Sequence, residues 1–418
     1  MNEPSHPMLS RRRLLVAAGV AGVGVAGVGT AVAVGRSDDG PTETITSSKG
    51  FVPFEGVHQS GIVTPHQQHG LVAAFNVTAP DRESLVEMFK SLTATTRDVM
   101  AGRSGEGRDA LLPPDDNLIL SPQIDPDGLT VTLAVGESLF DDRYGLSAKK
   151  PTRLVRMPAF PNDEPHPETS HGDLLVQICA DHDDTCTHAL RRLMRTNRKY
   201  LTLRWMLSGF VRPNELPPGQ TSVRNLLGFK DGTANLDPSD AALMNKHVWV
   251  QQGDEEPAWA TGGSYMAVRV IRNRVEFWDR TALRTQELII GRRKATGAPL
   301  DGTLETDLPR FADDPDARRT LASAHIRLAN PRTAETNSSM ILRRGFNYSL
   351  GFTPNGQLDQ GLLFVCFQRD LAKGFVAVQQ RLNGEALEEY IKPIGGGFYF
   401  ALPGVARSDG WLGEGLLS

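Results

Sequence analysis

Three short segments of the chain carry side chains that could support chemistry at a bound ligand. Asp231 lies within GFKDGTAN, where the flanking glycines would let the backbone approach a flat ligand closely. His325 lies within AHIRLANPR, and Arg343 lies within MILRRGFNY. A carboxylate can move a proton, a neutral imidazole can bind iron, and a guanidinium can stabilise a developing anion.

Each segment also has an ordinary structural explanation. Lys-Asp-Gly is typical of a turn, a lone histidine is usually structural, and paired arginines can serve a surface salt bridge. The ligand interpretation of His325 gains weight because there are only ten histidines and because this one is predicted to end a helical stretch. Taken singly, none of the three segments decides between these alternatives.

The three segments together, in this order, resemble the dye-decolorizing peroxidase family, in particular its exported branch associated with iron uptake. Further segments similar to that branch are EGVHQSGIVTP (55–65), FWDRTAL (277–283), TGAPL (296–300) and IGGGFYFALPG (394–404). The similarity covers essentially the whole chain after residue 52. It implies an α+β protein with a haem b cofactor and peroxidase activity.

The resemblance also implies a role for each matching residue. His325 would be the axial ligand of the haem iron, and Asp231 and Arg343 would be the catalytic residues on the opposite face of the haem. Further residues would contact the cofactor: Gly232, Thr233, Ala234, Asn330, Pro331 and Arg332. Hydrogen peroxide would be cleaved through a ferryl intermediate, with Asp231 shuttling the proton and Arg343 stabilising the departing charge. Dyes, phenolics or porphyrinogens would then supply electrons.

A second function remains open within the same pocket. The chain could handle haem in iron uptake, either as a deferrochelatase that releases the iron or as an oxidase of ferrous iron for an iron-permease system. The chain itself does not choose between the two functions. A homo-oligomer is compatible with either one.

Two supporting features are left open by the sequence. A carboxylate that orients His325 could come from Glu385, Glu388 or Glu389, which are predicted to share a helix, although such residues often form an exposed acidic face. Electrons from bulky reductants could enter through surface aromatics such as Trp259, Trp411 or Tyr390. These three are equally well explained by packing.

Composition is compatible with a packed soluble core and favours small molecules over polyanions as partners. The 418 residues carry a formal net charge of −4, and no Lys/Arg stripe interleaved with aromatics indicates a nucleic-acid partner. There are three cysteines, with neither a CxxC pair nor a CxxCH haem-attachment motif. Cys179 and Cys186 could form a disulfide, but their apolar neighbours favour buried free thiols.

The N-terminal residues are typical of an export signal. Arg11, Arg12 and Arg13 precede an uncharged Gly/Ala/Val-rich run that ends near an Ala-x-Ala pattern at residues 31–33. Paired arginines before a weakly apolar run indicate the twin-arginine route, which delivers folded proteins to the periplasm or the outside. A retained membrane anchor is the alternative, and the frequent glycines argue against it.

The hydrophobic pattern predicts two α+β units. We expect a signal peptide over 1–33, a linker over 34–52, a first ferredoxin-like unit over 53–225 and a second, haem-binding unit over 226–418. The first has the order β-α-β-β-α-β, with strands over 71–77, 129–135, 173–179 and 200–207 and helices over 81–100 and 183–195. The second has strands over 265–271, 362–368 and 398–402, helices over 280–290 and 371–382, and an insertion over 300–348.

Overall fold

The computed structural model describes residues 50–103, 111, 114, 116–120, 124–212 and 222–418. The predicted signal peptide and nearly all of the predicted linker lie outside these residues. None of the helices in the described part combines the length and the apolarity needed to cross a membrane.

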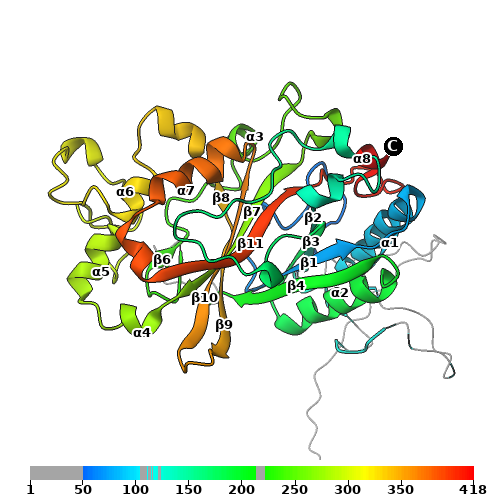
Figure 1. The fold of residues 1–418 in the computed structure, drawn as a ribbon, viewed down its shortest axis with the longest axis horizontal. Helices are drawn as coiled ribbons and strands as arrows, with labels where there is room; N and C mark the ends of the chain where they lie inside the picture. The colour runs from blue at the N-terminus through cyan, green and yellow to red at the C-terminus, as the bar shows by residue number, and fades with distance from the viewer. Residues whose placement is uncertain (1–49, 104–110, 112–113, 115, 121–123, 213–221) are drawn as a thin grey trace, which may run out of the picture. The chain divides into compact units, whose positions relative to one another are not determined.

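The central feature of the described residues is one antiparallel sheet that closes on itself (Figure 1). The strands run in the order β7-β11-β2-β3-β1-β4-β9-β10-β8, and β7 also pairs with β10, so eight strands form a ring. The short β8 pairs with β10 outside that ring. The strands are β1 (His69–Val77), β2 (Thr130–Gly136), β3 (Leu174–Ala180), β4 (Leu201–Phe210), β7 (Ser264–Asn273), β8 (Leu342–Arg343), β9 (Phe346–Phe352), β10 (Leu358–Gln368) and β11 (Ile391–Ala401).

The helices lie outside the ring. At the right of Figure 1, α1 and α2 lie beside the strands of the first half, and α4 to α7 gather at the left. Asp81 caps α1 by accepting the backbone N–H of Ser84 at 2.8 Å, as the sequence predicts. The helices are α1 (Arg82–Met100), α2 (Asp183–Thr196), α3 (Ala241–His247), α4 (Val275–Trp278), α5 (Leu283–Ile290), α6 (His325–Ala329), α7 (Ala377–Leu382) and α8 (Glu414–Leu417).

Alternation along the strands separates two hydrophobic cores. On β1, Val72 and Ala74 belong to a cluster to which all eight ring strands contribute, and this cluster fills the barrel interior. Leu71, Ala73 and Phe75 point the other way and pack with side chains of α1 and α2. Successive residues of a strand face opposite sides, so one strand serves both cores. The strands of the barrel therefore contact one hydrophobic core inside the barrel and a second core between the barrel and the helices.

The predicted α+β class and the elements of the first half are confirmed, and so are the predicted strands over 265–271 and 362–368, which lie within β7 and β10. Four other elements of the second half need correction. The last strand is β11 with eleven residues, because Pro393 and three glycines, which argue against a strand, lie within it and shift its register. The predicted insertion contains the short strand β8, and its last three residues begin β9, the strand that completes the ring and continues to Phe352. The helix predicted over 280–290 is shorter, and the one over 371–382 begins as a π-helical turn at Ala372–Val376.

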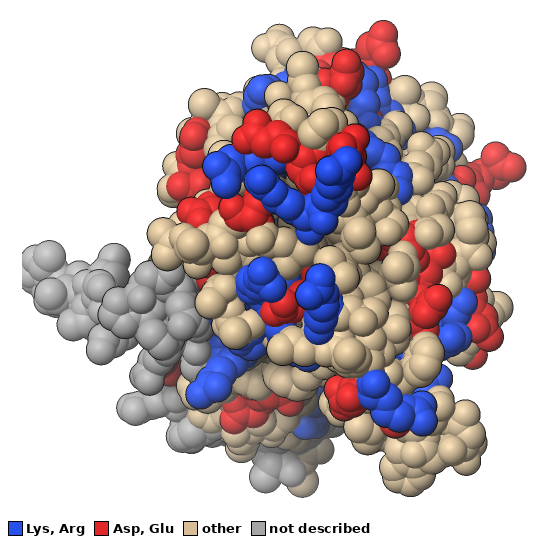
Figure 2. Space-filling model, turned by 90° about the vertical axis from the view of Figure 1, so that its left-hand side faces the viewer, with Lys and Arg blue, Asp and Glu red and all other residues tan. Residues whose placement is uncertain are grey.

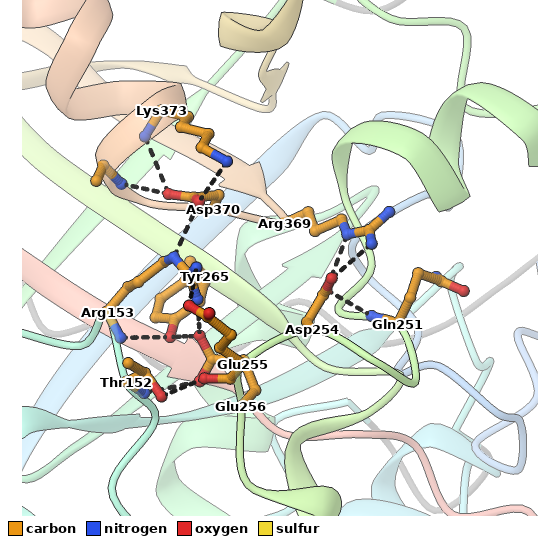
Figure 3. Close-up of polar contacts among 11 residues, drawn as sticks. Thr152, Arg153, Gln251, Asp254, Glu255, Glu256, Tyr265, Arg369, Asp370 and Lys373 are labelled. Atoms are coloured by element: carbon orange, nitrogen blue, oxygen red, sulfur yellow. Dashed lines mark hydrogen bonds and ion pairs between the residues drawn. The ribbon is translucent and has the colours of Figure 1, made fainter.

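A polar network of side chains joins the two halves of the chain (Figure 3). Arg153 from the first half donates to Glu256 at 2.9 Å and forms an ion pair with Asp370 at 2.9 Å. The hydroxyl of Tyr265 on β7 donates to the same Glu256 at 2.6 Å. Asp370 also accepts backbone N–H groups at the start of the π-helical turn, so this network anchors the segment that leads into α7.

All three cysteines are buried and unbonded, so the free-thiol interpretation is confirmed. Burial raises the pKa of Cys179 and of Cys186, which keeps both thiols protonated and unreactive.

Candidate haem site

A cavity lies on the outer face of the barrel wall, between β7, β10 and β11 on one side and α5, α6 and α7 on the other. Its volume is about 300 Å³. Mostly apolar walls with a few polar groups are typical of a cofactor pocket. The apolar wall includes Phe229, Ile271, Ile290, Ile326, Leu362, Phe364 and Phe375.

His325 lines this cavity and is held by a buried carboxylate. Its Nδ1 lies 2.7 Å from Oε2 of Glu385, whose side chain is 4% exposed. Burial lowers the pKa of His325 and the Glu385 carboxylate raises it, and the net direction is upward. With Nδ1–H donated to Glu385, Nε2 is the nitrogen left for a ligand. His325 begins α6 rather than ending a helix, because the preceding Ala324 has an extended backbone.

Glu385 was one of three carboxylates considered for this role, and the structure separates them. The three do not share an α-helix: Glu385 precedes a 3₁₀ turn over Ala386–Glu389. Glu388 lines the cavity but accepts the backbone N–H of Gly384 at 3.0 Å. Glu389 is exposed.

Asp231 and Arg343 line the same cavity and contact each other. Nη1 of Arg343 lies 3.4 Å from Oδ1 of Asp231, and Nη2 donates to the carbonyl of Thr233 at 2.9 Å. Asn235 bonds the backbone of Arg343 twice, through its amide nitrogen at 2.8 Å and its amide oxygen at 2.9 Å. The chain from Asp231 to Asn235 therefore forms one unit with the arginine.

The paired arginines divide between two surroundings. Arg343 faces the cavity, whereas Arg344 is 4% exposed and donates to the carbonyls of Thr64 and Pro65 and to the side chain of Gln67. Arg344 therefore ties the N-terminal segment to the barrel. Of these two neighbouring arginines, only Arg343 lines this cavity.

Most of the other predicted contact residues also line the cavity, namely Thr233, Ala234, Asn330 and Arg332. Gly232 and Pro331 do not line it. Gly232 has φ of +113°, and Ala234 and Arg332 have φ of +58° and +59°, so these loops turn through the left-handed region. Gly232 thus shapes the turn that presents Asp231 and Thr233.

Two arginines of the cavity were not predicted. Arg292 is buried, and burial together with the nearby Arg332 lowers its pKa to about 10. Arg269 is 1% exposed and forms an ion pair with Asp163 at 2.5 Å. Its Nε and Nη1 have no hydrogen-bond partner among the described residues. The available signal for Arg269 was a charged residue inside the apolar strand MAVRVI, since a buried charge needs a partner.

The surface aromatics differ in their relation to the cavity. Tyr390 contacts Trp278 with ring centroids 4.9 Å apart, and Trp278 contacts Phe229 of the cavity wall at 6.0 Å. Tyr390 is itself buried, so it is a packed residue and not a surface one. Trp259 donates to the carbonyl of Lys149 and packs in the outer core, and Trp411 also packs there.

The surface near α4, α5 and α6 carries charges of both signs. Figure 2 shows the left-hand side of the view in Figure 1, where basic and acidic side chains are interspersed. Such a surface creates no extended field of one sign. The arginines of the cavity, and not the surrounding surface, therefore set its affinity for an anionic group.

This fold and site define a dye-decolorizing type of haem peroxidase, and comparisons with known proteins agree. Residues 59–211 match the family model described as Dyp-type peroxidase, N-terminal, and residues 222–406 match Dyp-type peroxidase, C-terminal. The chain belongs to the Dyp-type peroxidase family and is a haem enzyme.

The chain is similar to particular members over its full length. It is 49% identical over 98% of its residues to a protein named deferrochelatase from Yersinia pestis, of which it covers 95%. It is 49% identical over its whole length to the deferrochelatase of Escherichia coli O157:H7, of which it covers 98%. A solved DyP-type peroxidase from Cellulomonas bogoriensis matches 88% of the chain and 98% of its own, with 34% identity and a TM-score of 0.79. Ferric DtpA from Streptomyces lividans matches with 35% identity, the same TM-score and 96% of its own chain covered.

The residues of the cavity fit a haem group. His325 offers one ring nitrogen while Glu385 holds the other, which is how protein ligands of metals are usually oriented. The walls are apolar, as a macrocycle requires, and Arg332 is a half-buried cation without a carboxylate partner among the described residues. Haem carries two propionates, and a guanidinium such as that of Arg332, whose pKa is lowered by burial, would suit a carboxylate of this kind.

Proposed function

We propose that this chain acts on haem and releases its iron, with peroxide-dependent oxidation of small reductants as a second activity of the same cavity. The observation that carries this choice is the 49% identity, over 98–100% of the chain, to proteins named deferrochelatase. The cavity supports both activities, because it places an axial-ligand candidate and a proton-carrying carboxylate at one apolar site. His325 and Arg343 serve both.

Asp231 is the proton-transfer group of this proposal. Removing iron from haem requires two protons to take the place of the metal ion on the pyrrole nitrogens, and the metal keeps its oxidation state. Among the titratable side chains of the cavity, Asp231 combines partial exposure with a hydrogen-bond network, so it can take protons from solvent and pass them inward. Asn225 assists by placing its amide nitrogen 3.5 Å from the other carboxylate oxygen.

Arg343 and His325 have complementary roles. Haem supplies the electrons for peroxide cleavage when it is bound as a cofactor. Arg343, fixed by Asn235 and Thr233, would then stabilise negative charge that develops on an oxygen atom in the cavity. His325 would hold the iron through Nε2, and Glu385 would keep the imidazole in the tautomer that leaves Nε2 free. The site assignments Gly232, Thr233, Ala234, Asn330, Pro331 and Arg332 as cofactor contacts belong to this proposal.

A spectroscopic experiment tests the proposal. The full-length protein is loaded with haem, its Soret band is recorded, and porphyrin fluorescence is followed over time, since free-base porphyrin fluoresces and haem does not. Wild type should form free porphyrin, and the His325→Ala variant should lose the Soret band. If haem stays bound for hours without porphyrin formation while peroxide consumes a phenolic reductant, the iron-release proposal is wrong and the peroxidase activity stands alone.

We further infer that the two halves are ferredoxin-like units, 53–225 and 226–418. Both halves place their four main strands in the same relative order, β2-β3-β1-β4 in the first and β9-β10-β7-β11 in the second, and the free edges of the two units pair to close the barrel. The cavity belongs almost entirely to the second unit, with Asn162 and Asn225 contributed by the first.

Export through the twin-arginine route to the periplasm or the exterior is also a proposal. It rests on the arginines at 11–13 and on the relatives that match the whole chain. A fusion of residues 1–40 to a reporter should be exported, and replacing Arg11, Arg12 and Arg13 by lysine should retain it in the cytoplasm. Export of the lysine variant would contradict this assignment. Cooperation with an iron-permease system and homo-oligomer formation remain proposals as well.

A further inference from the structure

A second cavity opens at one end of the barrel, on the opposite face of the wall from the haem site. Its volume is about 650 Å³. Trp205, Leu207, Val270 and Tyr348 line it, and all four belong to the cluster that fills the barrel interior. The second cavity is therefore the mouth of the barrel, a position where barrels commonly bind ligands.

The two cavities are separated by a single layer of strands. Ile271 lines the haem cavity and the next residue of β7, Arg272, lines the barrel mouth. On β11, Pro393 lines the first and Lys392 and Ile394 the second. Because neighbouring residues of a strand face opposite sides, a molecule in the barrel mouth lies outside the haem cavity and has its own contacts.

The floor of the barrel mouth holds two polar atoms that make no hydrogen bond within the described residues. Tyr348 is 0% exposed, and its hydroxyl makes no hydrogen bond. Nε of Arg272 is also without a hydrogen bond, since Oδ1 of Asp359 lies 4.0 Å away. Leaving a buried polar group unpaired is destabilising, because the group has lost its hydrogen bonds to water. A ligand atom that reaches the hydroxyl would remove that penalty, which favours a ligand with a polar substituent.

The rim of the barrel mouth favours an anion. Arg274, Arg280 and Lys392 line it and form no ion pair within the described part of the chain. Arg280 donates to a backbone carbonyl and interacts electrostatically with the Glu276 carboxylate, whereas Lys392 donates to the amide oxygen of Asn162. With Arg272, four cations meet three carboxylates: Glu164, Glu276 and Asp359. Glu276 is occupied by the backbone N–H of Leu358 at 2.7 Å.

The walls of the barrel mouth provide flat apolar contact. Phe277 is 45% exposed, Met206 is 44% exposed and Leu350 is 62% exposed, and all three line the cavity. Leu350 lies on the β9–β10 hairpin, which projects beyond the barrel at this end (Figure 1). Exposed large apolar residues gathered around cations indicate a ligand that is both apolar and charged.

We propose that the barrel mouth binds a planar aromatic anion, such as an aromatic sulfonate or carboxylate. The ring packs against Phe277, Met206 and Leu350, the charged group meets Arg274 and its neighbours, and a ring substituent reaches the Tyr348 hydroxyl. This site is separate from the haem cavity, and its occupancy is measured without turnover. Binding at the barrel mouth can therefore be confirmed or excluded whether or not the protein releases iron from haem.

Binding of anthraquinone-2-sulfonate to the haem-loaded protein tests the inference. Isothermal titration should give saturable binding for wild type, about tenfold weaker binding for Arg274→Gln and about fivefold weaker binding for Tyr348→Phe. The matched control is Arg284→Gln, which removes an exposed arginine of α5 that lines neither cavity, and it should bind like wild type. Neutral anthraquinone should bind more weakly than the sulfonate.

A variant of the haem cavity separates the two sites. Asp231→Asn should leave the affinity for anthraquinone-2-sulfonate unchanged, and the probe should not shift the Soret band. Loss of binding in Asp231→Asn, or a Soret shift on addition of the probe, would place the probe in the haem cavity and overturn the inference. Absence of saturable binding to wild type, or equal affinities for wild type, Arg274→Gln and Tyr348→Phe, would overturn it as well.

Discussion

Nδ1 of His325 lies 2.7 Å from Oε2 of Glu385, a residue 60 positions further along the chain. The imidazole begins α6 and the carboxylate precedes a 3₁₀ turn, so two irregular segments meet at the cavity wall. Glu385 is nearly fully buried, and His325 is the partner that the structure gives it. This contact fixes which ring nitrogen faces the cavity.

Glu385→Gln should weaken haem retention and activity while leaving the fold intact. The amide keeps the size of the side chain but cannot hold the charge that orients and polarises the imidazole, and losing such a partner costs about 10–100-fold. Transfer of haem to apomyoglobin, followed by absorbance, measures retention. Glu389→Gln, at an exposed carboxylate of the same turn, is the control and should transfer haem at the wild-type rate.

Asp231→Asn should lower the rate of peroxide-dependent oxidation by about 10²–10⁴-fold, because the amide cannot accept or return a proton. The Soret spectrum should stay close to wild type, since the carboxylate is not the proposed axial ligand. Stopped-flow kinetics with excess peroxide measure the effect. Asp237→Asn, at a carboxylate that bonds Ser239 and lies outside the cavity, should react like wild type. Wild-type rates for Asp231→Asn would remove this residue from the mechanism.

Arg332→Gln should speed the loss of haem without changing the axial ligand. Its guanidinium is half-buried and its pKa is lowered by burial alone, so a bound carboxylate would relieve the cost of its position. We expect about tenfold faster transfer to apomyoglobin and an unchanged ligand-field spectrum. The comparison variant is Arg318→Gln, whose side chain is 83% exposed. Equal rates for both variants would argue against a propionate contact at Arg332.

The stability of the protein should fall on acidification because of His66. Burial and the nearby Arg344 lower the pKa of His66 to about 4, from 6.5 in the unfolded chain. Between pH 6.5 and pH 4, His66 is protonated in the unfolded chain but stays neutral in the folded one. The free energy of unfolding therefore declines by about 3 kcal/mol over this range. Urea unfolding at pH 7 and pH 4.5 should show a smaller decline in His66→Gln than in wild type. Identical declines would exclude this histidine.

Local patterns were enough to predict the first half of the barrel. The strands of that half are continuous apolar runs or alternate with period two, and Asp81 marks the start of α1 by its own hydrogen bond, so neighbouring residues carry the information. Beyond residue 264, local pattern was also enough to predict β7 and β10, but β9 and β11 depend on distant partners. The sequence of β11 contains Pro393 and three glycines, which are unfavourable in a strand, so local pattern does not predict its full length. Its pairing with β7 and β2 keeps it extended. β9 exists because β4 and β10 pair with it.

The sequence alone determined the types and order of the reactive groups. Asp231, His325 and Arg343 could be singled out from three motifs, because the chemistry needs those side chains whatever the fold. Tertiary structure decided which groups meet them. It selected Glu385 among three carboxylates, separated Arg343 from Arg344, and brought Arg269 and Arg292 to the cavity. The physical reason is that strand pairing in a closed barrel brings together segments that are far apart in sequence. Local sequence patterns do not specify which of these segments become neighbours.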